Sequence, residues 1–424
     1  MNKKQILKGL IVAILIVVLC ASSYYVGVSS SYVGDTSEVW VNPPFSEASY
    51  VVGRYNSTYY YAKNGTTGKY DYLSTNFTYV LKTSLNNSPK GTYVYLKGGA
   101  SSDGFYITET IYIPDQVGLE GVGWDYDSAV TIRCTSNIDY VWLCHEASWL
   151  KNVYLESVQT TFTHTMLTVN GSYCYVFHVN IVRGGAYSVG GTGLKVLAGK
   201  VIYSIFEQIN IHGHFKYGCV LYNSGTFPNA YINVNQFYDI RVAIGDGGYG
   251  YVLNKTTNGD MQGNTFYSCT TDYGFNGTYI WINNAVDTTF FDFYTWDTVS
   301  GAILINITDS DAQDTAFIRG HLSWSNSPHI INNGLRTLFI DVDGFITASS
   351  GTAEASDTDT VSFGVTFAIS PQTVVITVNE NDARYIAQAY SITTTGFSLY
   401  LWDDVAGALE TSDKTISWIA KYNP

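Results

Sequence analysis

The chain has 424 residues and a formal net charge of −13, and only 13 % of its residues are charged. Its 22 lysines and arginines form no run after the N-terminus, which argues against a nucleic-acid partner because phosphate binding needs clustered cations. The 39 glycines, the 36 tyrosines and the 46 % of hydrophobic residues are typical of an extracellular β protein rather than of a cytosolic enzyme.

Residues 1–30 are predicted to be a transmembrane anchor or a signal peptide. Lys3, Lys4 and Lys8 precede an uncharged apolar run over residues 9–28. This run is long enough to cross a bilayer. The lysines before it predict a cytoplasmic N-terminus and an exported remainder. The alternative is cleavage after the run, which would release a secreted protein. Both alternatives predict an extracellular protein, at a cell or virion surface or secreted.

Potential N-glycosylation sites are spread over the exported part. The N-x-Ser/Thr sequence occurs eight times, which fits an exported glycoprotein. The asparagines concerned are Asn56, Asn64, Asn76, Asn86, Asn170, Asn254, Asn276 and Asn306.

Residues 31–88 form an N-terminal segment that is predicted to end in a helix. Over residues 75–86 the apolar side chains of Val80, Leu81 and Leu85 fall on one helical face. A helix in this place would cover the open end of a stack of strands, which otherwise exposes its core and a sheet edge.

A short apolar phrase repeats every 22–31 residues between positions 150 and 342. It consists of three apolar residues, the second three positions after the first and the third two positions after the second, as in Leu150, Val153 and Leu155. The last two positions lie on one face of a strand, and the wider first gap marks a corner. A fixed period of this size indicates a solenoid, so we predict an all-β, right-handed parallel β-helix over residues 89–348. An antiparallel sandwich is the competing interpretation. The phrases begin at Leu150, Val176, Phe206, Phe237, Phe266, Phe290, Phe317 and Phe339.

The segment before these repeats resembles a known family. Residues 90–99 (KGTYVYLKGG), 105–114 (FYITETIYIP) and 117–123 (VGLEGVG) resemble the start of the pectate-lyase superfamily, in the branch with phage tail-spike and exopolysaccharide-modifying proteins. The resemblance implies a right-handed parallel β-helix capped by a helix, and a homotrimer as in fibre-like relatives. Two features depart from the family pattern: the acidic residue that usually opens the helix is absent, and residues 100–104 interrupt a Gly-x-Tyr element.

The C-terminal part is predicted to be a separate β unit. Residues 349–360 are small, polar and acidic, which indicates a linker. Residues 361–424 have the alternation of a small β-sandwich and resemble the H-type lectin domain, a family that binds sugars and is commonly trimeric or hexameric. The resemblance suggests Arg384, Trp402 and Asp403 as sugar contacts, whereas Trp418 alternates with Ile416 as a core residue would.

Two kinds of polar position recur in the repeats. The residue two positions into each phrase is always polar, and we interpret this column as corners rather than as catalytic groups. The residues four and six positions in face outward, and their aromatic rings and amides suit sugars. Tyr154, Asn180, Asn210 and Trp296 are the predicted sugar contacts there. The corner column is Asn152, His178, Gln208, Asp239, Ser268, Asp292 and Arg319.

The chemistry of a possible reaction is only weakly marked. Hydrolysis needs two carboxylates flanking the glycosidic bond, and the Asp-Asp pair of the polygalacturonases in this superfamily has no counterpart at the matching corners. Lyase chemistry in the family uses a carboxylate-held Ca²⁺ and a basic Arg or Lys. Arg241, Asp246, Asp272 and His212 are weak candidates for such a site, with Ca²⁺ a possible ligand. No metal site is predicted, and no cofactor.

The cysteines have no metal-site spacing. Besides Cys20 there are Cys134, Cys144, Cys174, Cys219 and Cys269. We interpret these five as buried thiols of the core. One disulfide between Cys134 and Cys144 is the alternative.

These observations lead to one leading functional hypothesis and two rivals. The leading hypothesis is an extracellular, membrane-anchored, non-catalytic protein that binds polysaccharide or glycoprotein glycans for adhesion or host recognition. The first rival is a polysaccharide lyase or glycoside hydrolase. The second is a structural filament or envelope protein, for which residues 8–11 resemble the processing site of archaeal pilin-type signal sequences.

Overall fold

The structure is a computed structural model of the chain. The predicted anchor or signal segment, residues 1–30, lies outside the part that the structure describes. Within the described part, no helix is long and apolar enough to cross a membrane. The described residues are 48–98, 104–123, 130–134, 136–184, 189–225, 230–256, 258–272, 276–296, 302–322, 329–342, 348–364, 367, 370–379 and 385–421.

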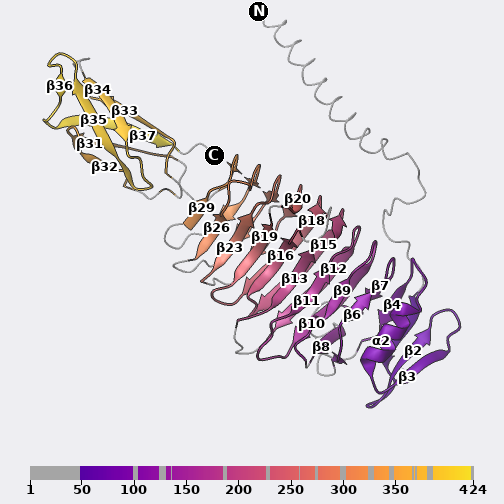
Figure 1. Cartoon of the computed structure of the whole chain (residues 1–424). Helices are drawn as coiled ribbons and strands as arrows, with labels where there is room; N and C mark the ends of the chain where they lie inside the picture. The colour runs from indigo at the N-terminus through magenta and orange to yellow at the C-terminus, as the bar shows by residue number, and fades with distance from the viewer. Residues whose placement is uncertain are drawn as a thin grey trace, which may run out of the picture. The chain divides into compact units, whose positions relative to one another are not determined.

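The repeats fold into successive coils of a right-handed parallel β-helix, as predicted. Each coil places its strands beside the same strands of the next coil, so that Leu150 pairs with Val176, and Val176 with Phe206. Figure 1 shows the strands of successive coils side by side in sequence order. Because these pairs are parallel, the antiparallel sandwich is wrong for this region.

Three sheets run along the β-helix. Sheet A contains β4 (Tyr93–Leu96), β5 (Phe105–Ile107), β7 (Gly118–Glu120), β8 (Val130–Cys134), β10 (Trp149–Ser157), β12 (Tyr175–Arg183), β15 (Ile205–Gly213), β18 (Gln236–Ile244), β21 (Thr265–Tyr267), β22 (Thr270–Thr271), β24 (Thr289–Phe291), β25 (Tyr294–Thr295), β27 (Ala316–Ile318), β28 (His321–Leu322) and β30 (Leu338–Ile340). Sheet B contains β6 (Ile111–Ile113), β9 (Val141–Leu143), β11 (Thr165–Val169), β13 (Thr192–Leu197), β16 (Tyr217–Asn223), β19 (Tyr249–Lys255), β23 (Thr278–Asn283), β26 (Ile303–Ile307) and β29 (His329–Asn332). Sheet C contains β14 (Lys200–Ile202), β17 (Tyr231–Asn233) and β20 (Asp260–Gln262).

The apolar phrase forms the interior of the β-helix. Leu150, Val153 and Leu155 have no exposed surface, and the same positions of the following coils are buried as far as Phe317, whereas Gly320 and Val342 near the C-terminal end are half-buried. From Phe206 onward the first position is a phenylalanine, and the rings of Phe206 and Phe237 stack 4.6 Å apart. Later rings in this column continue the stack at 4.5–5.1 Å. Each coil therefore covers the apolar rings of its neighbour, which it could not bury alone.

The polar column within the phrase marks a corner of every coil, as predicted. All its members have φ between 50° and 55°, the left-handed region, where short polar residues cost less than branched ones. Neighbouring members also contact each other: His178 Nδ1 lies 3.3 Å from Asn152 Oδ1, and Arg319 donates to Asp292 at 3.1 Å. The members of this column, Asp239 and Asp292 among them, thus form corners of the coils, as interpreted from the sequence.

A second corner is held by a ladder of buried polar side chains. The Oδ1 atom of Asn235 accepts a hydrogen bond from the backbone N–H of Ser204 in the preceding coil, at 3.0 Å. Asn264 Oδ1 accepts in turn from the N–H of Asn235, at 3.2 Å, and from its side-chain amide, at 3.0 Å. The amide of Asn264 also donates to Ile232 O at 2.9 Å. These bonds supply partners for backbone groups that the turn removes from the sheets.

The N-terminal end carries the predicted helix. Helix α2 (Phe77–Asn86) begins after Asn76, whose side chain accepts from the N–H of Tyr79, and it buries Val80, Leu81 and Leu85. An antiparallel meander adjoins it, and its first strand also pairs in parallel with β4. The meander is made of β1 (Ala48–Arg54), β2 (Tyr60–Asn64) and β3 (Tyr70–Ser74).

The C-terminal unit is an antiparallel sandwich of two small sheets. Trp418 is buried, as predicted, and its ring contacts Phe363 at 5.3 Å and Phe397 at 6.2 Å between the sheets. The predicted linker over residues 349–360 is wrong, because most of it forms the strand β31 (Ala348–Ala355), which pairs with β37 (Lys414–Lys421). The remaining strands are β33 (Thr373–Val378) in the first sheet and β32 (Thr360–Ser362), β34 (Tyr385–Tyr390), β35 (Gly396–Asp403) and β36 (Ala408–Leu409) in the second.

The five described cysteines are free, so the disulfide considered between Cys134 and Cys144 is not formed. Four of them are buried and Cys144 is half-buried, as expected for thiols of the core.

Candidate functional site

The outward face of sheet A is built from two columns of side chains just after the corner. In the first column, Asn210 pairs in register with Arg241, and Arg241 with Thr270. In the second column, two positions further along each strand, His212 pairs with Ala243. The N–H of Asp272 then donates to Val242 O at 2.7 Å, which continues the second column into the next coil. The first column reads Tyr154, Asn180, Asn210, Arg241, Thr270, Tyr294 and His321.

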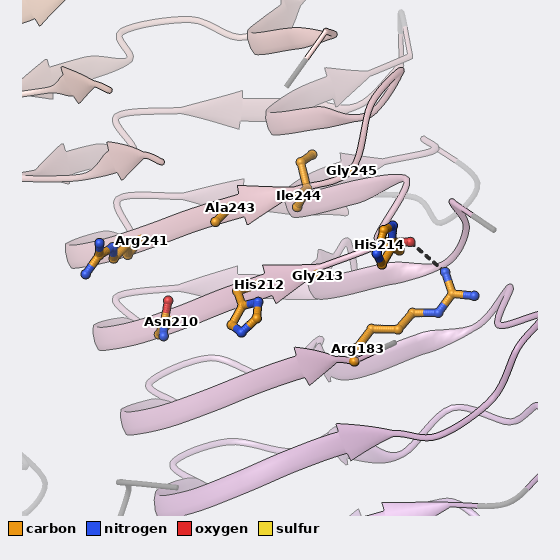
Figure 2. Close-up of a pocket in the computed structure, with 10 residues that line it drawn as sticks. Arg183, Asn210, His212, Gly213, His214, Arg241, Ala243, Ile244 and Gly245 are labelled. Carbon is orange, nitrogen blue, oxygen red and sulfur yellow. Dashed lines mark hydrogen bonds between the residues drawn. The ribbon is translucent and has the colours of Figure 1, made fainter. Parts of the chain in front are cut away.

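A groove of about 490 Å³ opens over these columns on β12, β15 and β18. Figure 2 shows Asn210 and His212 on one strand, and Arg241 and Ala243 at the matching places of the next. Ala243 has only a methyl group where the preceding coil has the imidazole of His212. This small side chain leaves room beside His212.

The end of the groove depends on a close approach of two backbones. Gly213 ends β15 with φ of 111°, and a Cβ atom at this position would lie 2.0 Å from the carbonyl oxygen of Arg183. Only glycine fits there. The chain can therefore turn directly after His212 and carry His214 to the edge of the groove (Figure 2).

Arg183 fixes this edge from inside the protein. Its side chain has no exposed surface. Its guanidinium donates to the carbonyl oxygens of His214 at 2.6 Å, Gly190 at 3.1 Å and Thr160 at 3.1 Å. One buried cation thus joins three turns of different coils, and we assign it a positioning role for His214.

The charges in the groove are unevenly exposed. Arg241 forms an ion pair with Asp272, but its side chain is 54 % exposed, whereas that of Asp272 is only 11 % exposed. The guanidinium therefore still presents donors to solvent. Burial lowers the pKa of His212 below its usual value, and the charges of Arg241 and His214 lower it further. At neutral pH the imidazole of His212 is therefore uncharged and can both donate and accept a hydrogen bond.

The weak catalytic candidates are only partly brought together. Arg241 and His212 line the groove, and Asp272 joins them through its ion pair with Arg241. Asp246 does not, because its Oδ1 atom accepts from the N–H of Asn276 at 2.8 Å and so links two turns. Among the described residues, no group of three or more histidines, cysteines or carboxylates is placed to hold a metal ion.

The sugar-contact predictions on this face divide according to burial. Asn210 lines the groove and Trp296 is 51 % exposed, so both are accessible. Tyr154 and Asn180 are each only 6 % exposed, and Tyr154 packs against Val182 on the outer side of the sheet. The structure therefore corrects the prediction for these two, because a side chain buried in this way offers no surface to a polymer.

In the C-terminal unit the predicted contacts also separate. Trp402 lies half-buried on the strand β35, where it pairs with Ile386. Asp403 is buried, and its Oδ1 atom accepts from the N–H groups of Val405 and Ala406, each at 3.0 Å. This carboxylate shapes a turn rather than facing a ligand. Arg384 lies outside the described residues.

The potential glycosylation sites differ in their surroundings. The exposed asparagines are Asn56, Asn76, Asn86 and Asn276. The half-buried ones are Asn64, Asn170, Asn254 and Asn306. Asn254 Oδ1 accepts from the amide of Asn283 at 2.9 Å, and the Oδ1 atom of Asn306 is buried. Modification at all eight positions stays a prediction, and the exposed four are the ones that the fold leaves open.

No protein-family model matches this sequence, and no curated protein sequence matches it. Solved structures share its fold. The likeness is one of architecture. The Dettilon tailspike protein is 11 % identical, with a TM-score of 0.32, over 82 % of this chain and 91 % of that chain. A tailspike protein of Acinetobacter baumannii bacteriophage Fri1, described as a capsular polysaccharide depolymerase, is 10 % identical, with a TM-score of 0.37, over 82 % of each chain. An alginate lyase from Paenibacillus sp. is 12 % identical, with a TM-score of 0.28, over 63 % of this chain and 97 % of that chain.

Sequence reasoning found the columns but missed Arg183. This residue ends the strand β12, outside the two outward columns, and its polar head turns back towards the carbonyls of neighbouring turns. The sequence did contain a signal for this role: Arg183 comes at the end of an apolar strand and is directly followed by Gly184.

Proposed function

We propose that the protein binds an acidic polysaccharide in the groove over Asn210, His212 and Arg241. The supporting observation is the character of this groove. On a chain of net charge −13, the described lining residues of this groove include no carboxylate, and Arg241 keeps 54 % of its side chain exposed although it pairs with Asp272. A uronic acid matches such a surface, because a guanidinium binds a carboxylate with paired, charge-assisted hydrogen bonds.

Each residue of the groove has a distinct role in this proposal. Arg241 donates to the sugar carboxylate, and Asn210 exchanges hydrogen bonds with a ring hydroxyl. The uncharged imidazole of His212 bonds a second hydroxyl without adding a charge. An exposed ion pair contributes little by itself. A polymer with many uronic acids compensates for this weakness through the high effective concentration of its remaining units.

The proposed setting is the outside of a cell or virion. In this proposal, residues 9–28 anchor the chain in a membrane unless they are cleaved, the chain forms a homotrimer, and binding takes place without catalysis. The C-terminal unit contributes a second, lectin-like contact through Trp402, whose ring lies half-buried on an outer strand face.

A polysaccharide lyase is the second candidate, and the neighbourhood of His212 and Arg241 favours it. Arg241 would neutralise the uronic carboxylate and so acidify the proton on the adjacent ring carbon. The neutral imidazole of His212 would accept that proton. The electron pair of the broken C–H bond would form a carbon–carbon double bond, and the glycosidic oxygen would leave and be protonated.

The test is a retention assay of the full chain on immobilised polygalacturonate, alginate and dextran, together with the size of each polymer after incubation. We expect retention on one or both acidic polymers, an at least tenfold loss with Arg241→Gln, and unchanged polymer size. Asp272→Asn should strengthen retention, because it releases Arg241 from its ion pair. The matched control is Arg336→Gln, since Arg336 forms a similar exposed pair with Asp314.

Each outcome decides between the candidates. Equal retention of wild type and Arg241→Gln, or no retention on any acidic polymer, would overturn the binding proposal. Shortened polymer with the ultraviolet absorbance of an unsaturated uronic acid would establish the lyase instead. In that case His212→Gln should abolish shortening and leave retention in place.

A further inference from the structure

A second groove lies on the same face of sheet A, further towards the C-terminal end. It has a volume of about 540 Å³. Tyr294 and His321 line it from the strands β25 and β28, and Asp292, Arg319 and Asp341 line it from the corners. Tyr294 and His321 belong to the first outward column, so this groove continues the face that carries Arg241.

The second groove, unlike the first, is lined by carboxylates, those of Asp292 and Asp341. Arg319 donates to Asp292 at 3.1 Å, which balances one carboxylate. Asp341 adds another carboxylate, and it is exposed. The net negative charge of this groove would repel the carboxylate of a uronic acid. The hydroxyl groups of an uncharged sugar can instead donate hydrogen bonds to the carboxylates of the groove. The groove therefore suits a sugar that carries no negative charge.

An aromatic surface adjoins this groove. The rings of Tyr294 and Trp296 stack nearly parallel, with centroids 6.2 Å apart and an interplanar angle of 18°. Trp296 is 51 % exposed, so its ring is open to a ligand. Aromatic faces bind apolar surfaces such as the C–H faces of pyranose rings, and their polar edges leave the sugar hydroxyls to neighbouring groups. His321 lies beside Tyr294, with ring centroids 6.5 Å apart.

We infer that the ligand is a heteropolysaccharide in which a uronic acid is followed by an uncharged sugar. This inference rests on the proposed function for the first groove. Arg241 pairs with Thr270, and Thr270 with Tyr294, so the backbones of Arg241 and Tyr294 lie two coil spacings, or roughly 10 Å, apart. The ion pair with Asp272 of the intervening coil carries the guanidinium of Arg241 towards Tyr294 and Trp296. About one coil spacing, roughly 5 Å, therefore separates the guanidinium from these rings, which suits two neighbouring sugars of one polymer. One polymer running along the coils binds its uronic acid at Arg241 and stacks its uncharged sugar on Tyr294 and Trp296.

The experiment compares two families of probes on the full chain: galacturonate oligosaccharides and hyaluronan oligosaccharides, in which glucuronate alternates with an uncharged amino sugar. We expect hyaluronan oligosaccharides to bind more tightly than galacturonate ones of equal length. Trp296→Ala should weaken hyaluronan binding roughly tenfold, the loss of one ring contact. It should leave galacturonate binding unchanged. Tyr173→Ala is the matched control, because Tyr173 is 49 % exposed and stacks on Tyr203 away from the columns.

The failure of this inference can be separated from failure of the proposed function. If Arg241→Gln weakens both probes and Trp296→Ala weakens neither, the second site is refuted and the first stands. If Arg241→Gln weakens neither probe, or neither probe binds, the proposed function fails and the inference fails with it. A Trp296→Ala loss that is equal for both probes would also refute the assignment of an uncharged sugar to this groove.

Discussion

Replacing Asn264 by alanine tests the role of the buried ladder at the second corner. The side chain is completely buried, and it makes three hydrogen bonds that link neighbouring coils: two accepted from Asn235 and one donated to Ile232 O. Alanine leaves three polar groups without these partners in a site that has little access to water. Each such group costs about 1–3 kcal/mol. We therefore expect Asn264→Ala to lower the free energy of unfolding by about 3–5 kcal/mol. This value is in the lower part of the sum over the three groups, because the amide that is removed no longer has to lose its own hydration on folding.

The assay is urea denaturation followed by tryptophan fluorescence, with the unfolding rate as a second readout. The matched control is Asn233→Ala. Asn233 also links two coils, since its amide donates to Asp260 Oδ2 at 2.8 Å and its Oδ1 atom accepts from the N–H of Gln262 at 2.9 Å, but these bonds are exposed. Water replaces the exposed bonds, so we expect a loss below about 1 kcal/mol. If both variants lose the same stability, burial of the ladder does not govern its contribution, and the reasoning is refuted.

Two further predictions concern titratable groups. The pKa of His212 in the folded state lies below its usual value, so the unfolded chain binds a proton more readily than the folded chain. His212 therefore contributes fully to stability above its usual pKa. This contribution is lost as the pH falls through the lowered pKa of the folded state. The urea midpoint of His212→Gln should therefore decline less than that of wild type from neutral to mildly acidic pH, and parallel declines would contradict this. Burial raises the pKa of Cys174 and of Cys269 to about 12. Mass spectrometry after treatment with a thiol reagent should find both unlabelled in the native protein and labelled in urea, and rapid native labelling would disprove their inertness.

The sequence predicted those features that repeat with the coil. The spacing of Leu150, Val153 and Leu155 reproduces the geometry of one strand and its corner, so inward and outward sides followed directly from counting residues. The same counting placed Asn210 next to Arg241. The helix after Asn76 also followed from local apolar spacing.

Features that depend on contacts between distant segments could not be predicted in this way. Tyr154 and Asn180 occupy outward positions, yet they are buried, and strand periodicity reports only the side of the sheet on which a residue lies. The guanidinium of Arg183 finds its acceptors 7 to 31 residues away in the turns around it. The strand β31 is rich in small and polar residues, and its partner β37 begins only at Lys414. No local pattern marks such a strand.

The two outward columns lie on coils whose stability comes from the interior phrase and the corner ladder. A binding surface of this kind can change in length by whole units. Duplication of one coil, some 22–31 residues, would move the site at Tyr294 away from Arg241 by one strand spacing, about 4.8 Å, without requiring a new core. Deletion of the coil that carries Thr270 would bring the two sites together by the same step. The repeat period of the recognised polysaccharide would thus be recorded in the number of coils between two side chains, and evolution could follow a changing polymer by adding or removing a coil.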